Sequence, residues 1–180
     1  ILFASRLVWE KNVHTLMEIY KRLQRSGIAH NFIVAGDGVA GEEMKRQMPE
    51  AIFLGTLTHE ELSKLYASSD IFVFPSISET YGNVIVEAMA SGLPCIIADG
   101  GGSADLIRHG QTGYKCPPLS ADDYLIYIRM LLSDPTLHRF MRDNGLAYVQ
   151  KLDWTNLVDR YFEEVTQLGL QSGKNMVSAA

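Results

Sequence analysis

The chain has 180 residues, of which 47% are hydrophobic and 21% charged, and its formal net charge is -5 at pH 7. This apolar content can bury the core of one domain of ordinary size, which argues against intrinsic disorder. The acidic balance excludes a typical nucleic-acid binder, because no basic stripe offsets it. No segment reaches the roughly 18 apolar residues of a membrane span, so we expect a cytoplasmic protein.

Short apolar runs alternate with amphipathic stretches along most of the chain, which is the pattern of βα units around a parallel sheet. The runs predict strands at residues 1–4, 32–35, 52–54, 71–74 and 95–98 and a short one around Tyr114. Helical spacing predicts helices at 13–25, 41–47, 60–68, 83–91, 104–108, 124–132, 136–150 and 156–168. Thr58 and Glu61 predict a capping box before the third helix. The predicted fold class is α/β, a doubly wound parallel sheet with helices at the C-terminal end.

We expect one domain over residues 1–168 and a flexible tail at 169–180, where Gln, Ser, Gly, Lys and Asn dominate. The sequence begins inside a strand-like run at Ile1, which predicts a piece of a longer protein. Cys95 is expected in a strand and Cys116 in a loop. Their spacing matches neither a metal site nor a disulfide scaffold, so both are interpreted as ordinary thiols.

The most informative segment reads PSISETYGNVIVEAMASGLP and carries two carboxylates, Glu79 and Glu87, on either side of a glycine. A buried strand ends just before it and a helix follows Gly82, so the segment lies where open α/β sheets bind ligands. Backbone N–H groups of Gly82, Asn83 and Val84 at the start of that helix would attract an anion. Glu87 shares a helix face with Asn83, and a carboxylate there suits hydroxyl groups. The segment therefore predicts a site for phosphate and sugar.

A second segment, SRLVWEKN, follows the first strand and offers two cations, Arg6 and Lys11. Arginine supplies a planar fork of donors and lysine a point charge, a pair that suits adjacent phosphates. The alternative is that both are solvated surface charges paired with Glu10.

Glycine turns follow further strands. In AGDG, a tight turn with Asp37 capping the next helix explains the glycines without a ligand. The loop from Gly55 to Leu57 either holds a flat base against Leu57 or simply connects two elements. In DGGGSADLI, Asp105 is either a ligand contact or a surface charge.

Several chemistries are absent from the sequence. There is no Asp-x-Asp, no clustered His and Cys set, and no serine in a nucleophile elbow. We therefore expect no metal site. Arg6, Lys11 and a helix terminus would neutralise a diphosphate instead.

These motifs, in this order and spacing, resemble the C-terminal donor-binding domain of retaining family-four glycosyltransferases of the GT-B fold. The segments that carry the resemblance are SRLVWEKN, then GTLTHEELSKLYASSDIFVFPSISETYGNVIVEAMASGLP, then GG and GQTG. The resemblance covers roughly residues 1–168.

The resemblance implies catalytic roles for three residues. Arg6 and Lys11 would hold the donor diphosphate, and Glu79 would contact hydroxyls of the transferred sugar. It also implies donor-binding roles elsewhere: Glu87 for the ribose, the backbone of Gly82, Asn83 and Val84 for sugar and phosphates, and the loop of Gly55 and Leu57 for the base.

The implied activity is transfer of a hexosyl unit from a UDP- or GDP-sugar to a lipid, saccharide or polysaccharide acceptor, with retention and without a metal or further cofactor. The family binds its acceptor through an N-terminal domain that this sequence lacks, so the isolated domain is expected to bind donor and transfer little. The resemblance also implies a peripheral membrane contact of the full-length protein. Two alternatives stay open, a nucleotide-binding module without transferase activity and half of a sugar-nucleotide epimerase.

Overall fold

The structure is a computed structural model that describes residues 1–152, 158, 162–163 and 165–166. Its contacts group Ile1–Val149 into one compact unit and Gln150–Ala180 into a second. The helix predicted at 156–168 lies largely outside the described residues, and the tail at 169–180 lies wholly outside them. The domain boundary at residue 168 therefore stays a prediction.

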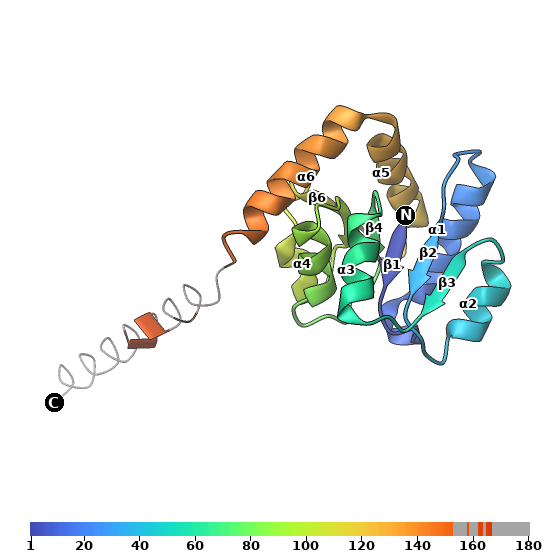
Figure 1. Cartoon of the computed structure of the whole chain (residues 1–180), viewed down its shortest axis with the longest axis horizontal. Coiled ribbons are helices and arrows are strands. Elements are labelled where there is room, and N and C mark those ends of the chain that lie inside the picture. Colours follow the sequence, from blue (N-terminus) through green and yellow to red (C-terminus); the bar gives the residue numbers. More distant parts are fainter. Residues whose placement is uncertain (153–157, 159–161, 164, 167–180) are drawn as a thin grey trace. The chain divides into compact units, whose positions relative to one another are not determined.

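One sheet of six parallel strands forms the centre of the first unit, in the order β3-β2-β1-β4-β5-β6 (Figure 1). This is the order of a doubly wound α/β sheet, so the predicted fold class is confirmed. The strands lie close to the predicted apolar runs: β1 Leu2–Ala4, β2 Ile33–Ala35, β3 Ile52–Gly55, β4 Phe72–Phe74, β5 Cys95–Ala98 and β6 Gly113–Cys116. Placing Cys116 in a loop was wrong, because it pairs with Ala98 at the end of β6 and is buried.

The helices also follow the predicted pattern closely (Figure 1). They are α1 Val13–Arg25, α2 Gly41–Gln47, α3 His59–Ala67, α4 Asn83–Ala90, α5 Ala121–Ser133 and α6 Pro135–Val149, with short 3-10 helices η1 Trp9–Lys11 and η2 Gly102–Leu106. The helix predicted at 104–108 is thus the 3-10 turn η2. The capping box at α3 is confirmed, since Thr58 Oγ1 accepts from Glu61 N at 3.3 Å and Glu61 Oε2 accepts from Thr58 N at 2.8 Å.

Helices cover both faces of the sheet. α1 packs against α2 and α5, whereas α4 packs against α3 and α6. In Figure 1, α3 and α4 lie in front of the sheet. β1, β4 and β5 are buried along their whole length, as expected for central strands with helices on both sides. The edge strand β3 alternates between exposed and half-buried residues.

The AGDG turn after β2 has a structural explanation, although not the predicted one. Asp37 Oδ1 accepts from Gly38 N at 2.7 Å and does not cap α2, whose N-cap Ala40 makes no side-chain cap bond. Gly36 passes so close to the β1 loop that a Cβ would lie 1.9 Å from the Ser5 carbonyl oxygen. The turn therefore needs glycine at position 36, because the backbone there lies too close to the backbone of Ser5 to leave room for a side chain.

The strands β1 and β4 are neighbours in the sheet, but the chain leaves them in opposite directions, to β2 and to β5. Ligands of such sheets bind at this switch point, outside the carboxyl ends of the strands. The loops that carry Lys11 and Glu79 both start there. Separately, none of the helices among the described residues has the length and apolarity needed to cross a bilayer.

Candidate functional site

Lys11 and Glu79 form an ion pair across the switch point. Lys11 Nζ lies 2.5 Å from Glu79 Oε1, and the two side chains are only 9% and 18% exposed. Ser76 Oγ donates to the same carboxylate oxygen at 3.2 Å, and Ser78 Oγ lies 3.4 Å from the ammonium. Lysine is seldom buried without a partner. The structure thus brings together two predicted site residues that are far apart in the sequence.

The short helix η2 packs against the backbone of the Glu79 loop. Gly102 N donates to the Glu79 carbonyl oxygen at 2.9 Å. A Cβ on Gly102 would lie 1.9 Å from the Thr80 carbonyl oxygen, so the close packing requires glycine. Asp105 is exposed in η2 and lines neither of the two pockets described below.

Arg6 differs from Lys11 in its surroundings. Its side chain is 71% exposed, and Nη2 lies 3.1 Å from Oε1 of the exposed Glu10. The alternative interpretation of this loop, surface cations paired with Glu10, therefore describes Arg6 but not Lys11. Arg6 nevertheless lines a pocket at the carboxyl edge of the sheet.

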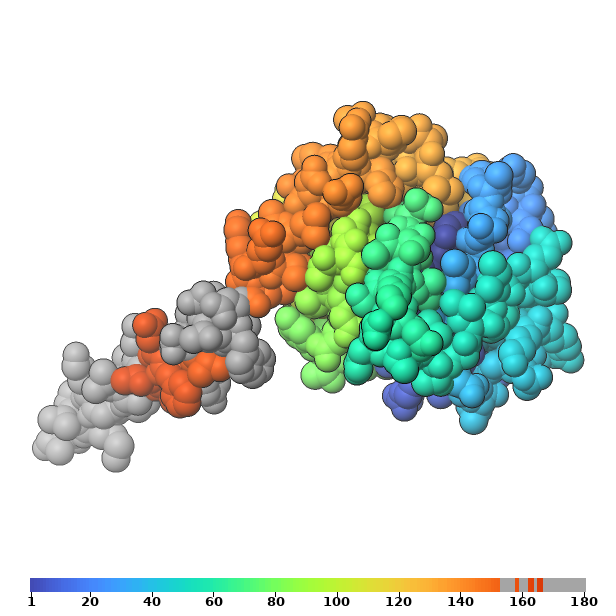
Figure 2. All heavy atoms as spheres, viewed as in Figure 1, coloured from blue at the N-terminus to red at the C-terminus, as the bar shows by residue number. Residues whose placement is uncertain are grey.

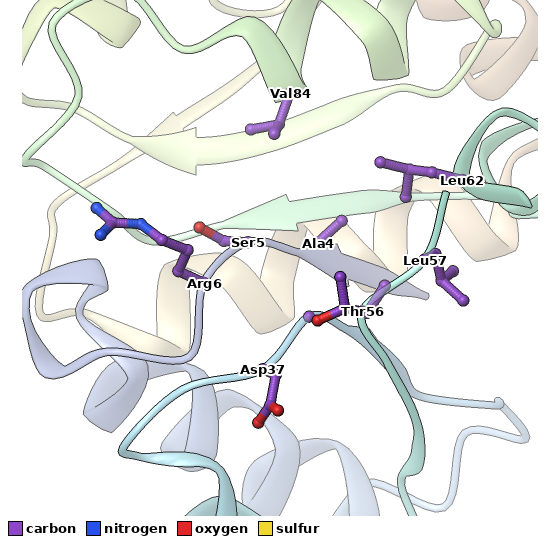
Figure 3. Close-up of a pocket in the computed structure, with 10 residues that line it drawn as sticks. Ala4, Ser5, Arg6, Asp37, Thr56, Leu57, Leu62 and Val84 are labelled. Atoms are coloured by element: carbon purple, nitrogen blue, oxygen red, sulfur yellow. The ribbon is translucent and has the colours of Figure 1, made fainter. Parts of the chain in front are cut away.

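This first pocket has a volume of about 220 Å³. Ser5 and Arg6 lie at one end, Leu57 and Leu62 at the other, and Val84 approaches from α4 (Figure 3). The Asp37 carboxylate points away from Val84. The pocket thus has one cationic end and one apolar end. Its lining is Ala4, Ser5, Arg6, Ala35, Gly36, Asp37, Thr56, Leu57, Leu62 and Val84.

A second pocket, of about 270 Å³, lies between α3 and α4 and shares Leu62 with the first. Figure 2 shows this face of the molecule, where the atoms of α3 lie beside those of α4. The pocket is lined by His59, Leu62, Ser63, Tyr66, Glu87, Ala90 and Ser91. The shared residue makes the two pockets neighbours along one edge.

Glu87 is held by a tyrosine in this second pocket. The hydroxyl of Tyr66, which is 2% exposed, donates to Glu87 Oε2 at 3.3 Å. Burial and then the Glu87 charge raise the pKa of Tyr66, so the hydroxyl stays protonated and remains a donor. Glu87 Oε1 has no hydrogen-bond partner within the described part of the chain.

The other predicted positions are backbone features. Gly82 has φ 92° and is the N-cap of α4, and Asn83 begins the helix with an exposed side chain. First-turn amides of a helix have no intrahelical partner, so they point to whatever lies beyond the N-terminus. Gly55 has φ 68°, and its carbonyl oxygen accepts from Gly36 N at 2.7 Å. These three residues line neither pocket.

Sequence reasoning missed Tyr66, Ser76 and Ser78. Two signals were available. Leu62 and Tyr66 are four apart on α3 and therefore share a helix face. Ser76 and Ser78 stand two apart directly after β4, and in the structure their hydroxyl oxygens lie 3.2 Å from each other beside the lysine. The described residues contain no group of three or more His, Cys, Asp or Glu side chains able to hold a metal ion.

Curated relatives match most of this chain but are much longer. A sulfoquinovosyl transferase, SQD2 of Arabidopsis thaliana, is 38% identical over 160 residues, which cover 86% of this chain and 30% of the relative. A GDP-mannose-dependent alpha-mannosyltransferase of Corynebacterium glutamicum is 42% identical over 167 residues, 91% of this chain and 39% of the relative. The chain thus spans well under half the length of either protein.

Solved structures share the fold. Anabaena Alr3699/HepE, in complex with UDP, superposes with a TM-score of 0.79 at 25% identity, over 92% of this chain and 48% of that one. TarM superposes with a TM-score of 0.81 at 19% identity, over 90% of this chain and 34% of its own. The family model described as "Glycosyl transferases group 1" matches residues 1–147. The chain therefore belongs to the group 1 glycosyl transferases.

Proposed function

We propose that this chain is the donor-binding domain of a retaining glycosyltransferase that moves a hexosyl unit from a UDP- or GDP-sugar to a lipid, saccharide or polysaccharide acceptor. The observation that carries the proposal is the largely buried Lys11–Glu79 pair at the switch point of the sheet. Two similar proteins support the donor class: HepE has been solved with UDP, and the corynebacterial enzyme is named for GDP-mannose.

The donor would lie along the two adjoining pockets. Arg6, at the cationic end of the first pocket, would meet the diphosphate together with Lys11 and the first amides of α4. Leu57 and Leu62 form the apolar end, which suits a base. Glu87 lines the pocket that shares Leu62, so its carboxylate would accept from ribose hydroxyls. Glu79 would accept from hydroxyls of the sugar to be transferred.

The reaction breaks the bond between the anomeric carbon and the diphosphate oxygen, and the bonding electrons leave with the nucleoside diphosphate. The acceptor oxygen bonds to the same carbon from the same face, and its proton passes to the departing phosphate oxygen. No side chain of this domain forms a covalent bond in that scheme. Arg6 and Lys11 stabilise the negative charge on the leaving group, and we propose no metal ion or further cofactor.

The proposal assigns acceptor binding to a part of the full-length protein outside these residues, together with any peripheral membrane contact. Because the chain spans 30% and 39% of the two relatives, their other regions have no counterpart here. We place the reaction in the cytoplasm.

Calorimetric titration of the 180-residue chain with UDP, GDP and ADP, in the presence of EDTA, tests the donor assignment. We expect micromolar binding of UDP or GDP that chelator does not change. Binding of none of the three would overturn the proposal for this chain, and binding that requires a divalent cation would overturn its metal independence. Epimerisation of a free nucleotide sugar without acceptor would identify the epimerase alternative.

A further inference from the structure

Asn12, the residue after Lys11, has an unusual backbone conformation and a fully used side chain. Its φ of 54° makes it the one non-glycine residue with positive φ among those the structure describes. Its Nδ2 donates to the Pro75 carbonyl oxygen at 3.1 Å and to the Pro118 carbonyl oxygen at 2.8 Å. Its Oδ1 accepts from Thr15 Oγ1 at 2.9 Å.

These bonds connect three loops at the carboxyl edge of the sheet. Asn12 lies in the loop after β1, Pro75 directly follows β4, and Pro118 follows β6. The donor and acceptor are 63 residues apart in the first bond and 106 in the second. One half-buried amide therefore links the loops that follow three strands.

Both halves of the Lys11–Glu79 pair adjoin this junction. Lys11 is the preceding residue of the chain. On the other side, Pro75 is followed by Ser76, whose hydroxyl donates to Glu79 Oε1 at 3.2 Å. A shift of either loop would therefore change where the ammonium and the carboxylate meet.

We infer that Asn12 is a positioning residue: its side-chain amide holds the loops of Lys11 and Glu79 at the separation that the donor diphosphate and sugar require. The inference rests on the proposed function, because it assigns Asn12 to the same site. A misplacement of about 1 Å can lower the rate of a reaction between positioned groups about 100-fold, so the hydrogen bonds of one such amide are significant.

The identity of the residue supports a role beyond the turn itself. Asparagine and glycine both tolerate the left-handed backbone region, and glycine does so without strain. A turn alone would be satisfied by glycine. The amide with its two donors is what asparagine adds, and both donors are used on the neighbouring loops.

The test compares wild type with Asn12→Gly, which keeps the backbone conformation accessible and removes the amide. Tyr20→Phe is the control, because it removes one hydrogen bond, which the Tyr20 hydroxyl accepts from Glu50 N at 3.0 Å and which involves none of the proposed site residues. We expect the affinity for inorganic pyrophosphate and for UDP or GDP to fall at least about tenfold in Asn12→Gly. Tyr20→Phe should stay within about twofold of wild type.

A second readout needs no ligand. A buried, paired lysine ammonium exchanges protons slowly with water, so the Lys11 ammonium should give an NMR signal, assigned by its loss in Lys11→Gln. In Asn12→Gly this signal should broaden or vanish, whereas in Tyr20→Phe it should persist. If Asn12→Gly does not fold, Asn12→Asp replaces it: aspartate keeps the Thr15 bond but cannot donate to either proline carbonyl, and the same losses are expected.

The outcomes separate the two proposals. Unchanged affinity and an unchanged Lys11 signal in the variant would overturn the role of Asn12 and leave the proposed function standing. If wild type binds none of the ligands, the donor assignment fails and the ammonium signal alone decides whether Asn12 positions Lys11.

Discussion

Glu87, which we propose binds the ribose hydroxyls, has its carboxylate oriented by a neighbouring side chain. Oε2 accepts from the hydroxyl of the buried Tyr66, whereas Oε1 has no hydrogen-bond partner among the described residues, and Glu87 lines the second pocket. Since burial raises the pKa of Tyr66, its hydroxyl stays a donor throughout the neutral range. The orientation of the carboxylate therefore does not depend on the ligand alone.

Removing only the Tyr66 hydroxyl should weaken nucleotide binding selectively. A hydrogen bond contributes about 0.5–1.5 kcal/mol, so Tyr66→Phe should lower the affinity for UDP or GDP by roughly two- to tenfold. Glu87→Ala should lower it further, and neither variant should change the affinity for pyrophosphate, which has no ribose. Calorimetry with the two ligand types measures this. Equal losses for pyrophosphate and nucleotide would show that the tyrosine acts through the fold.

Among the elements, α3 connects local sequence with the site. Its capping box at Thr58 and Glu61 fixes where the helix begins, and its inner face then presents Leu62 and Tyr66 to the pockets. Hydrogen bonds from the Thr58 backbone N–H and then its hydroxyl lower the pKa of Glu61. Glu61 thus completes the cap in its ionised form.

Loss of the cap should destabilise the fold measurably. Thr58→Ala should reduce the free energy of unfolding by about 1 kcal/mol at pH 7, measured by urea denaturation. Because the folded pKa of Glu61 lies below its usual 4.5, its contribution is present above that value and is lost as pH falls through the folded pKa. Thr58→Ala keeps the backbone N–H bond to Glu61 and loses the hydroxyl bond, so the difference between wild type and variant should shrink in acid by the share of the hydroxyl bond alone. If wild type and Thr58→Ala differ equally at pH 7 and at a pH below the folded pKa of Glu61, this role of Glu61 is contradicted.

The strands and most helices could be predicted because their signals are local. Apolar runs, helical spacing and the Thr58 cap each lie within a few residues. The contacts that build the site are not local: Lys11 and Glu79 are 68 residues apart, and Asn12 and Pro118 are 106 apart. The motifs predicted which loops form the candidate site. Which side chains of those loops contact one another depends on the strand order, which the motifs do not give. The roles predicted for the site residues await the ligand experiments.

At the scale of the whole molecule, the site lies between two groups of three strands, β3-β2-β1 and β4-β5-β6. The first group supplies Arg6, Lys11 and Leu57, and the second supplies Glu79 and Glu87. Every proposed donor contact therefore belongs to this one chain, whereas acceptor binding is assigned elsewhere.

We accordingly expect binding without turnover. Saturating UDP or GDP, at about 100 times Kd, should stabilise the fold by about 2.7 kcal/mol and raise its melting temperature. The same preparation should release no nucleoside diphosphate from UDP-glucose or GDP-mannose above the spontaneous rate, with or without saccharide acceptors. Multiple turnovers by the isolated chain would show that the acceptor half is not needed.

The ladder between β1 and β4 is short: among the described residues it pairs Leu2 with Phe72, whereas β5 and β6 share four such pairs. The two halves of the sheet are therefore joined at its centre by little strand pairing of their own. Beyond that ladder, the Asn12 amide and the Lys11–Glu79 ion pair connect the loop after β1 with the loop after β4. A donor bound across the loops that follow β1 and β4 would add a further connection between the two halves of the sheet. The stiffness of the domain would then vary with ligand concentration, while the pairing of the outer strands would stay unchanged.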